Sequence, residues 1–400
     1  MPAGRPRALL YAYSCEPGRG SEPEAGWGIV QAVSRIADCT VLLPDAHAGL
    51  VRAHLSAHPN PSIAVVEVPE GRWARRAKWH RIPWFVAYLA WLRRAGRTAR
   101  RLHAMDGFDL SHHVTYSVYW LPTPAATDDA PSVWGPVGGA VVTPRRLWRL
   151  LGWRGIIDEL VDRASVRGAA RSRSTTRTWR RADVRLVQNV ETLERLPPTA
   201  QTDTVILNHA LFIAPPNCSW DGGRDVVWVA GLESRKGPRL AVRALAATHE
   251  DVRLVMIGDG PERRSVARLA RRLGVSHRLD LPGRIPREEV LDRMSHAAAV
   301  LFTGLREEGG VALAEAAMIG TPLVVLAHGG ARAVVGNPTD PDRVALVEPA
   351  DVATTARHLG EAMEHFVRHA PTGRGSLLDT GIAFEALRAA YDRALGRSGS

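Results

Sequence analysis

The sequence predicts an α/β protein built from two doubly wound, Rossmann-like domains in tandem. With 400 residues, the chain is long enough for two domains of ordinary size. In each half, short apolar runs alternate with helical patterns, an order that is typical of parallel sheets with helices on both faces. Ligands of such sheets bind beyond the carboxyl ends of the strands, so a cleft between the two domains is the expected active site.

The first domain is expected to cover residues 1–210. Its apolar runs have the length of buried strands, and the segments between them have helical patterns. The expected strands are residues 7–14, 39–43, 63–68, 110–114, 132–134, 184–187 and 204–207, and the expected helical segments are 22–34, 46–57, a basic stretch at 72–101 and an arginine-rich stretch that ends at 181.

Residues 211–224 contain two prolines, two glycines, an asparagine and an aspartate, and they are expected to form a linker. A second alternating series then predicts the second domain over residues 225–375. Its expected strands are 226–230, 253–257, 279–281, 299–302 and 322–326, and its expected helices are 237–247, 262–273, 287–296 and 311–319. Residues 376–400 are expected to form a helix and a tail that could pack back toward the first domain.

Composition excludes several classes of protein. With 45% hydrophobic and 23% charged residues, the chain is not disordered, fibrous or built around disulfides. Its three cysteines lack the spacing of a zinc site or a disulfide framework, which favours a reducing compartment. The longest apolar run, residues 82–92, is shorter than the roughly 18 residues that a membrane-spanning helix needs. We expect a cytoplasmic protein without an export signal, at most peripheral at the inner face of the membrane.

The net charge of +11 is concentrated in the N-terminal half. Residues 72–101 include ten basic residues and no acidic one, and residues 145–185 include twelve arginines against four acidic residues. Aromatic residues are interleaved with the arginines of the first stretch, as in helices that lie at a membrane interface. The alternatives are an amphipathic helix packed on its own domain with a solvated basic face, or contact with an anionic acceptor; nucleic acid is not expected as a partner.

A glycine-rich loop follows the first expected strand and leads into a helix. Gly18 and Gly20 would let the backbone approach a ligand, and the helix N-terminus would present N–H groups to a phosphate. Ser21 and Glu24 have the spacing of a capping box. The alternative is a tight turn that binds nothing.

A second loop, which follows the strand expected at 299–302, contains two glutamates and two glycines. The helix after it carries Glu315 in an otherwise apolar run, and a buried carboxylate needs a partner. A ribose diol would satisfy Glu315. The amides of Gly309 and Gly310 could hold a diphosphate, and Glu307 could reach the hydroxyls of the group attached to it. The alternative is a solvated acidic loop and an internal salt bridge to Glu315.

Lys236 lies between the strand expected at 226–230 and the next helix. Lysine and arginine together number 52, and only two of these residues are lysines. A lysine at the carboxyl side of a core strand therefore indicates that a compact point charge is needed, and phosphate is its expected partner. The alternative is that Lys236 has no functional role and could equally be an arginine.

Several segments of the second half occur in a characteristic order. They are GLESRKG at 231–237, IGDGP at 257–261, PGRI at 282–285, EEGGVALAE at 307–315 and TPLVV at 321–325. Together they resemble the nucleotide-sugar motifs of retaining GT-B glycosyltransferases of family 4. Residues 16–27 and the run WGPVGG at 134–139 resemble one bacterial branch of that family. The resemblance covers nearly the whole chain, loosely at 45–105 and after 345.

The resemblance implies roles for residues of the second domain. Glu307 and Glu315 correspond to the family's E-x7-E pair, with Glu307 on the donor sugar and Glu315 on the ribose. Lys236 would neutralise the diphosphate, and the backbone at Arg284 and Ile285 would hold the base.

Two further positions follow from the same resemblance. Gly20 would lie against the sugar phosphate. The family usually has an arginine at the position of Gly231, as a partner of the lysine, and its absence is a departure from the pattern. Arg235 could substitute by reaching around the loop, or donor binding could be weakened or altered.

His112 and His113 end the strand expected at 110–114, where the family carries an active-site histidine near the donor sugar. The alternation of a strand must point the two rings to opposite sides. His113 is slightly favoured for the role over His112. The alternative is that both are ordinary core or surface histidines.

We therefore expect a metal-independent glycosyltransferase that retains anomeric configuration. Its donor substrate would be a nucleotide-diphosphate sugar, and no resident cofactor is expected. Its acceptor would be bound by the first domain, and the alternatives are a glycan, a lipid-linked molecule or a natural product, with an anionic acceptor among them. Asp340 and Asp342 mimic a metal-binding D-x-D, but they lie in a proline turn beyond the core strands, so no metal site is expected.

Two rival functions remain open on the same fold. A nucleotide-sugar epimerase would use the donor without an acceptor. A catalytically impaired module that binds sugar nucleotides or membranes would be consistent with glycine at position 231.

Overall fold

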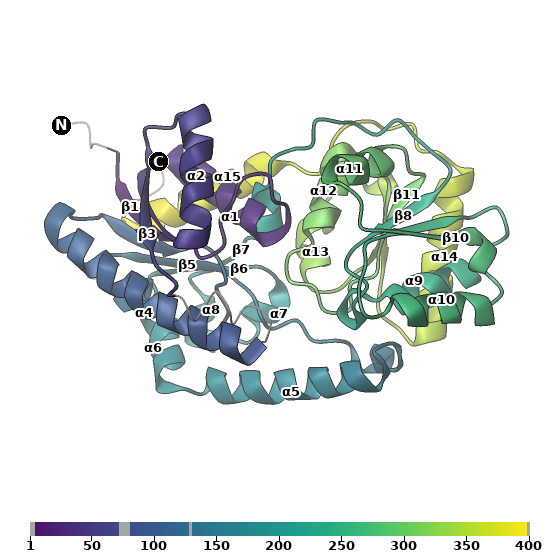
Figure 1. Ribbon diagram of the computed structural model, residues 1–400, viewed down its shortest axis with the longest axis horizontal. Coiled ribbons are helices and arrows are strands. Elements are labelled where there is room, and N and C mark those ends of the chain that lie inside the picture. The colour runs from purple at the N-terminus through teal and green to yellow at the C-terminus, as the bar shows by residue number, and fades with distance from the viewer. Residues whose placement is uncertain (1–4, 72–80, 128–129, 398–400) are drawn as a thin grey trace. The chain divides into compact units, whose positions relative to one another are not determined.

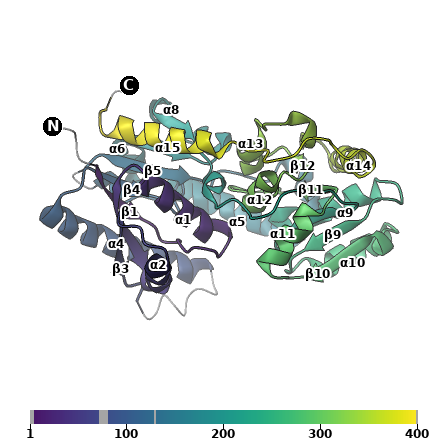
Figure 2. The same ribbon diagram turned by 90° about the horizontal axis from the view of Figure 1, so that it is seen from above.

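The computed structural model describes residues 5–71, 81–127 and 130–397, and it divides into two compact units (Figures 1 and 2). The first unit comprises residues 1–140, 166–214 and 380–400, and the second comprises 141–165 and 215–379. Compared with the expected domains, residues 141–165 lie in the second unit rather than the first. The C-terminal helix lies in the first unit.

The first unit contains a seven-stranded sheet in the order β3-β2-β1-β4-β5-β6-β7, and all of its strand pairs are parallel. Its strands are β1 (Arg7–Tyr11), β2 (Asp38–Pro44), β3 (Ile63–Val68), β4 (Leu110–His113), β5 (Ser132–Val137), β6 (Val184–Val187) and β7 (Thr204–Ile206). Its helices are α1 (Ser21–Ser34), α2 (Asp45–Ala57), α4 (Arg81–Asp106), α6 (Arg173–Arg181), α7 (Val190–Leu193), α8 (Pro198–Gln201) and α15 (Thr380–Ala394), with short 3-10 turns η1 (Ala125–Thr127) and η3 (His209–Phe212). Helix α5 (Gly152–Ala170) begins in the second unit and ends in the first.

Alternation along β1 separates the two faces of this sheet. Ala8 and Leu10 belong to a core that includes residues of α1 and α15. Leu9 and Tyr11 belong to a second core that includes residues of α4. Strand side chains alternate between faces, so helices cover both sides, as the sequence predicts.

The start of α1 differs from the capping box expected at Ser21 and Glu24. Gly20 is the N-cap residue, with φ of 71°, and no side chain of a described residue caps the helix there. Ser21 also has a positive φ, 56°, and is already the first helical residue. The helix begins one residue earlier than expected, and Gly20 at the cap combines a positive φ with a ψ of 174°, a conformation that glycine adopts more readily than serine.

The basic segment proposed for membrane contact is described only in part, since residues 72–80 lie outside the described residues. In α4, Tyr88 and Trp91 are buried in the core of the first unit. Arg93, Arg97 and Arg100 lie on the exposed side of the same helix. The described part of the segment is thus an amphipathic helix packed on its own unit, with Tyr88 and Trp91 inside and Arg93, Arg97 and Arg100 in solvent.

The second unit contains a six-stranded parallel sheet in the order β10-β9-β8-β11-β12-β13. Its strands are β8 (Val226–Val229), β9 (Leu254–Ile257), β10 (Leu279–Gly283), β11 (Ala299–Phe302), β12 (Leu323–Leu326) and β13 (Val344–Val347). Its helices are α9 (Pro238–Ala246), α10 (Arg263–Arg272), α11 (Arg287–Ser295), α12 (Val311–Ile319), α13 (Gly330–Val335) and α14 (Val352–Arg368), with 3-10 turns η2 (Arg145–Leu150), η4 (Ser234–Lys236), η5 (Ser276–Arg278) and η6 (Pro341–Arg343).

The core of this unit includes a segment from the middle of the expected first domain. Leu147, Leu150 and Leu151 are buried in one cluster with Trp228 of β8 and Leu240 of α9. Three leucines in a five-residue span would fit the core of either unit. Only the fold shows which sheet they cover.

Among the residues that the structure describes, no helix combines the length and the hydropathy needed to cross a bilayer.

Candidate functional site

Two of the predicted donor-site residues of the second unit, Lys236 and Glu307, lie where its strand order reverses. Strands β8 and β11 are neighbours in the sheet, but the chain continues from β8 to β9 on one side and from β11 to β12 on the other. Loops that leave such a pair of strands diverge and open a crevice at the carboxyl edge of the sheet. Lys236 follows β8 and Glu307 follows β11, so both lie at this edge of the sheet.

Lys236 and Glu307 form the central contact of the site. The Lys236 ammonium donates to Oε2 of Glu307, and both side chains are mostly buried. Nη1 of Arg235 lies 4.0 Å from the same carboxylate oxygen, while Nε of Arg235 donates to Glu233 at 2.7 Å. Residues 71 positions apart are therefore joined in one charged cluster.

Backbone contacts hold the two loops together. The amides of Leu305 and Arg306 both donate to the Arg235 carbonyl, at 2.9 and 3.0 Å. The Thr303 hydroxyl donates to the carbonyls of Lys236 and Gly237 at 3.1 Å. A Cβ at Gly237 would lie 2.1 Å from the Thr303 carbonyl oxygen, so the close approach of the loops requires glycine there. These contacts fix Lys236 next to Glu307.

Glu315 on α12 has a partner that the sequence did not identify. Nη2 of Arg287 on α11 donates to Oε1 of Glu315 at 2.6 Å, and Glu315 is only 7% exposed. The internal salt bridge considered as an alternative is thus present. The need for a partner was predictable from the apolar surroundings of Glu315, but a residue 28 positions earlier has no spacing signal.

The N-terminus of α12 lies in the same loop as Glu307. Gly310 is its N-cap residue, with a left-handed φ of 78°, and no side chain of a described residue caps it. The first amides of an α-helix lack intrahelical partners and carry the positive end of its dipole. With Gly309 before it, this helix start can receive an anionic group beside Lys236.

Arg284 and Ile285 follow the end of β10. Gly283, the last residue of that strand, has φ of 86°, and its carbonyl accepts a hydrogen bond of 2.8 Å from the Gly258 amide after β9. Arg284 is exposed and Ile285 is half-buried. Both residues therefore lie at the carboxyl edge of the sheet and are at least partly exposed.

The candidate residues of the first unit also lie at its point of reversal, between β1 and β4. Gly20 follows β1, and His112 and His113 end β4. As predicted, the two rings point to opposite sides. His112 contacts Tyr391 of α15 through Nδ1 at 2.8 Å, and His113 contacts Tyr88 of α4 through Nε2 at 3.2 Å.

Both histidines are buried, and both nitrogens of each ring are engaged. Nε2 of His112 lies 2.6 Å from the Gly135 carbonyl, and Nδ1 of His113 lies 3.0 Å from the Thr123 hydroxyl. Desolvation lowers the pKa of His112 to about 4 and that of His113 to about 3. In this structure each acts as a neutral, hydrogen-bonded core residue.

Within the part of the chain that the structure describes, no group of three or more histidine, cysteine, aspartate or glutamate side chains is arranged to hold a metal ion. Asp340, from the D-x-D-like sequence, is paired with Arg343 at 2.7 Å.

The arrangement in the second unit suits a ligand that combines a diphosphate with hydroxyl groups. A lysine, a neighbouring arginine and a helix N-terminus offer positive charge to phosphate oxygens. Two carboxylates nearby can accept hydrogen bonds from hydroxyls.

Comparisons with known proteins agree with this chemistry. Residues 219–366 match the sequence profile of the family described as "Glycosyl transferases group 1". The 2-deoxystreptamine glucosyltransferase of Streptomyces kanamyceticus is 28% identical over 183 residues, which is 44% of this chain and 47% of that protein. The D-inositol 3-phosphate glycosyltransferase of Xylanimonas cellulosilytica is 31% identical over 173 residues, 42% of this chain and 39% of that protein. The chain thus spans less than half the length of these relatives.

Solved structures are similar over nearly the whole chain. Anabaena HepE in complex with UDP-glucose has a TM-score of 0.54 at 15% identity, covering 97% of this chain and 99% of that one. Sucrose-phosphate synthase from Thermosynechococcus elongatus has a TM-score of 0.59 at 17% identity, covering 98% and 100%. The molecule has the GT-B fold of two Rossmann-like domains, which confirms the predicted fold class. The segment that matches the glycosyltransferase group 1 profile, residues 219–366, lies within its second unit.

Proposed function

We propose that the protein is a glycosyltransferase of family 4, which transfers a sugar from a nucleotide-diphosphate donor to an acceptor with retention of anomeric configuration and without a metal ion. The observation that carries the proposal is the Lys236–Glu307 contact at the reversal of the second sheet, inside the segment that matches the glycosyltransferase family. The neighbour HepE, solved with UDP-glucose, supports a nucleotide-sugar donor.

Departure of the nucleotide diphosphate builds negative charge on its phosphate oxygens. Lys236 and the N-terminus of α12 would stabilise this charge in a largely buried setting, where fixed charges and dipoles act strongly. When the donor is bound, Lys236 would turn from Glu307 to the diphosphate. Glu307 would then accept hydrogen bonds from the donor sugar, and Glu315 from the ribose.

The first prediction is that Lys236→Ala and Glu307→Ala each lower the transfer rate by about a hundredfold or more, because each removes a charge that acts in the transition state. Transfer is measured with a panel of nucleotide sugars, after thermal-shift screening has identified the nucleotide that stabilises the protein. Glu348→Ala is the matched control, since Glu348 is an exposed glutamate of the same unit, paired only with Arg332 among described partners.

Melting temperatures close to that of the wild type would show that the two variants fold. Full transfer activity of either variant with the proper donor would contradict the proposed roles of Lys236 and Glu307 and, with them, the proposed function. Incubation of donor without acceptor, followed by NMR, separates the epimerase alternative, because only an epimerase would convert the sugar in that case.

We also propose that the acceptor is anionic or presented at an anionic surface, on the strength of the exposed arginines of α4. The second prediction is that the protein sediments with anionic vesicles more than with neutral ones, and that added salt weakens this binding. Arg93→Glu combined with Arg97→Glu should weaken it further. Equal sedimentation with both vesicle types would contradict peripheral membrane contact while leaving the transferase proposal intact.

A further inference from the structure

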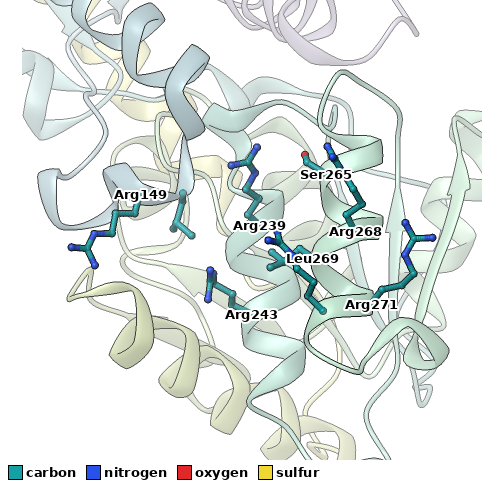
Figure 3. Close-up of a pocket in the computed structure, with 9 residues that line it drawn as sticks. Arg149, Arg239, Arg243, Ser265, Arg268, Leu269 and Arg271 are labelled. Carbon is teal, nitrogen blue, oxygen red and sulfur yellow. The ribbon is translucent and has the colours of Figure 1, made fainter.

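A basic pocket lies in the second unit, apart from the donor-site residues. Six of its nine lining residues are arginines, and the others are two leucines and a serine. Its volume is about 490 Å³. Arg239 and Arg243 come from α9, Arg268 and Arg271 from α10, and Arg149 from η2 (Figure 3).

Most of this positive charge is not neutralised by the protein. Arg239 is paired with Glu262 at 2.6 Å. Within the described ranges, the other five arginines of the pocket form no ion pair with a carboxylate. Positively charged side chains that line one pocket repel one another, and an anion in the pocket would relieve that repulsion.

Helix dipoles account for only part of the cluster. Arg243, Arg271 and Arg272 lie in the last turns of α9 and α10, where a cation is favourable. Arg239 lies in the first turn of α9 and Arg268 in the middle of α10, where the dipole gives no such benefit. A common anionic ligand explains both groups.

We propose that this pocket binds a small molecule that carries two or more linked phosphates. Guanidinium groups match phosphate oxygens in a bidentate manner. The pocket volume lies within the range of about 300 to 1,000 Å³ that is usual for small-molecule sites. The arginines come from two helices and a 3-10 turn, so they offer several separate points of attachment, which a chain of linked phosphates can occupy together.

The site is distinct from the proposed donor site. None of the pocket residues is a predicted donor residue, and Lys236 and Glu307 contact each other rather than the pocket. A ligand here would therefore bind in addition to the sugar nucleotide.

The test is calorimetric titration with sodium tripolyphosphate at about 0.15 M salt, where charges beyond roughly 8 Å are screened. We expect Arg243→Glu combined with Arg271→Glu to weaken binding by about tenfold or more, because each reversal turns an attraction into a repulsion. Arg253→Glu combined with Arg264→Glu is the control. Both of those arginines are exposed and lie outside the pocket, and the change in net charge is the same.

The variant Lys236→Ala should keep tripolyphosphate binding, which separates this pocket from the donor site. Equal loss in the control pair would show an effect of net charge and overturn the proposal. If Lys236→Ala loses tripolyphosphate binding and the double variant Arg243→Glu, Arg271→Glu keeps it, the ligand binds at the donor site and the proposal is overturned as well.

Vesicles containing phosphatidylglycerol, compared with phosphatidylcholine vesicles, form the lipid arm. One result would replace the small-molecule proposal with membrane contact. In it, the wild type does not bind tripolyphosphate, and the double variant Arg243→Glu, Arg271→Glu loses binding to the anionic vesicles. Thermal unfolding of every variant checks that loss of binding is not loss of fold.

Discussion

At the scale of single residues, Gly231 is the least expected feature of the donor site. A Cβ at this position would have its nearest contacts at 3.5 Å, from Glu233, and 3.8 Å, from the Asp259 carbonyl. These are ordinary van der Waals distances, so the loop has room for a side chain. Arg235 is the residue that could take the role of an arginine at 231, because its Nη1 lies 4.0 Å from Glu307.

The third prediction is that Gly231→Arg folds and lowers the donor KM by about tenfold, because one more charge-assisted hydrogen bond to the diphosphate becomes possible. Arg235→Ala should raise the KM in the wild type, and by less in the Gly231→Arg background. An unchanged KM in Gly231→Arg would mean that the loop does not point this position at the donor.

At the scale of elements, β4 places two neutral histidines in the core. Burial lowers both pKa values below the ordinary 6.5, to about 4 for His112 and about 3 for His113. Below pH 6.5 the unfolded chain takes up protons at these rings and the folded chain does not. Their contribution to stability is therefore complete above pH 6.5 and is lost progressively as the pH falls toward the folded pKa values.

The fourth prediction is that the free energy of unfolding falls between about pH 6 and about pH 5 by about 1.4 kcal/mol per pH unit for each histidine. Denaturant unfolding at the two pH values measures this slope. His112→Gln and His113→Gln should each remove their share of the slope, although both lower stability at pH 7 by losing buried hydrogen bonds. If both variants show the same dependence of the unfolding free energy on pH as the wild type, the two histidines do not cause it.

The elements also show how far the sequence alone could lead. The strands at 63–68 and 299–302 and the helix at 311–319 have the predicted bounds. Helix α14 and strand β13 have no counterpart among the predicted elements, because the predicted series stops at residue 326. Placing Lys236 and Glu307 in loops was possible from local patterns. Their contact was not, because it depends on β8 and β11 being neighbours, and no local pattern contains the order of a sheet.

At the scale of the whole molecule, α15 connects the last part of the chain to the core of the first unit. Leu387 is 1% exposed and packs in the cluster that contains β1 and α1 residues. The fifth prediction is that Leu387→Ala costs about 2 to 5 kcal/mol, through lost burial and a cavity, and that faster hydrogen exchange is confined to strands of the first unit.

Ile382→Ala is the control for this prediction, because Ile382 lies on the same helix and is 68% exposed. It should change stability by less than about 0.5 kcal/mol. Faster exchange in the strands of the second unit after Leu387→Ala would contradict the separation into two units.

The discontinuous division of the chain has a consequence for its synthesis. A ribosome releases residues 215–379 as one stretch, with residues 141–165 already made, so the second unit can fold while the chain is still growing. The first unit includes residues made before the second unit but receives α15 only after residues 215–379 have been made. The unit that is begun first is therefore completed last, and until α15 is made its sheet lacks the helix that covers Leu10 and His112.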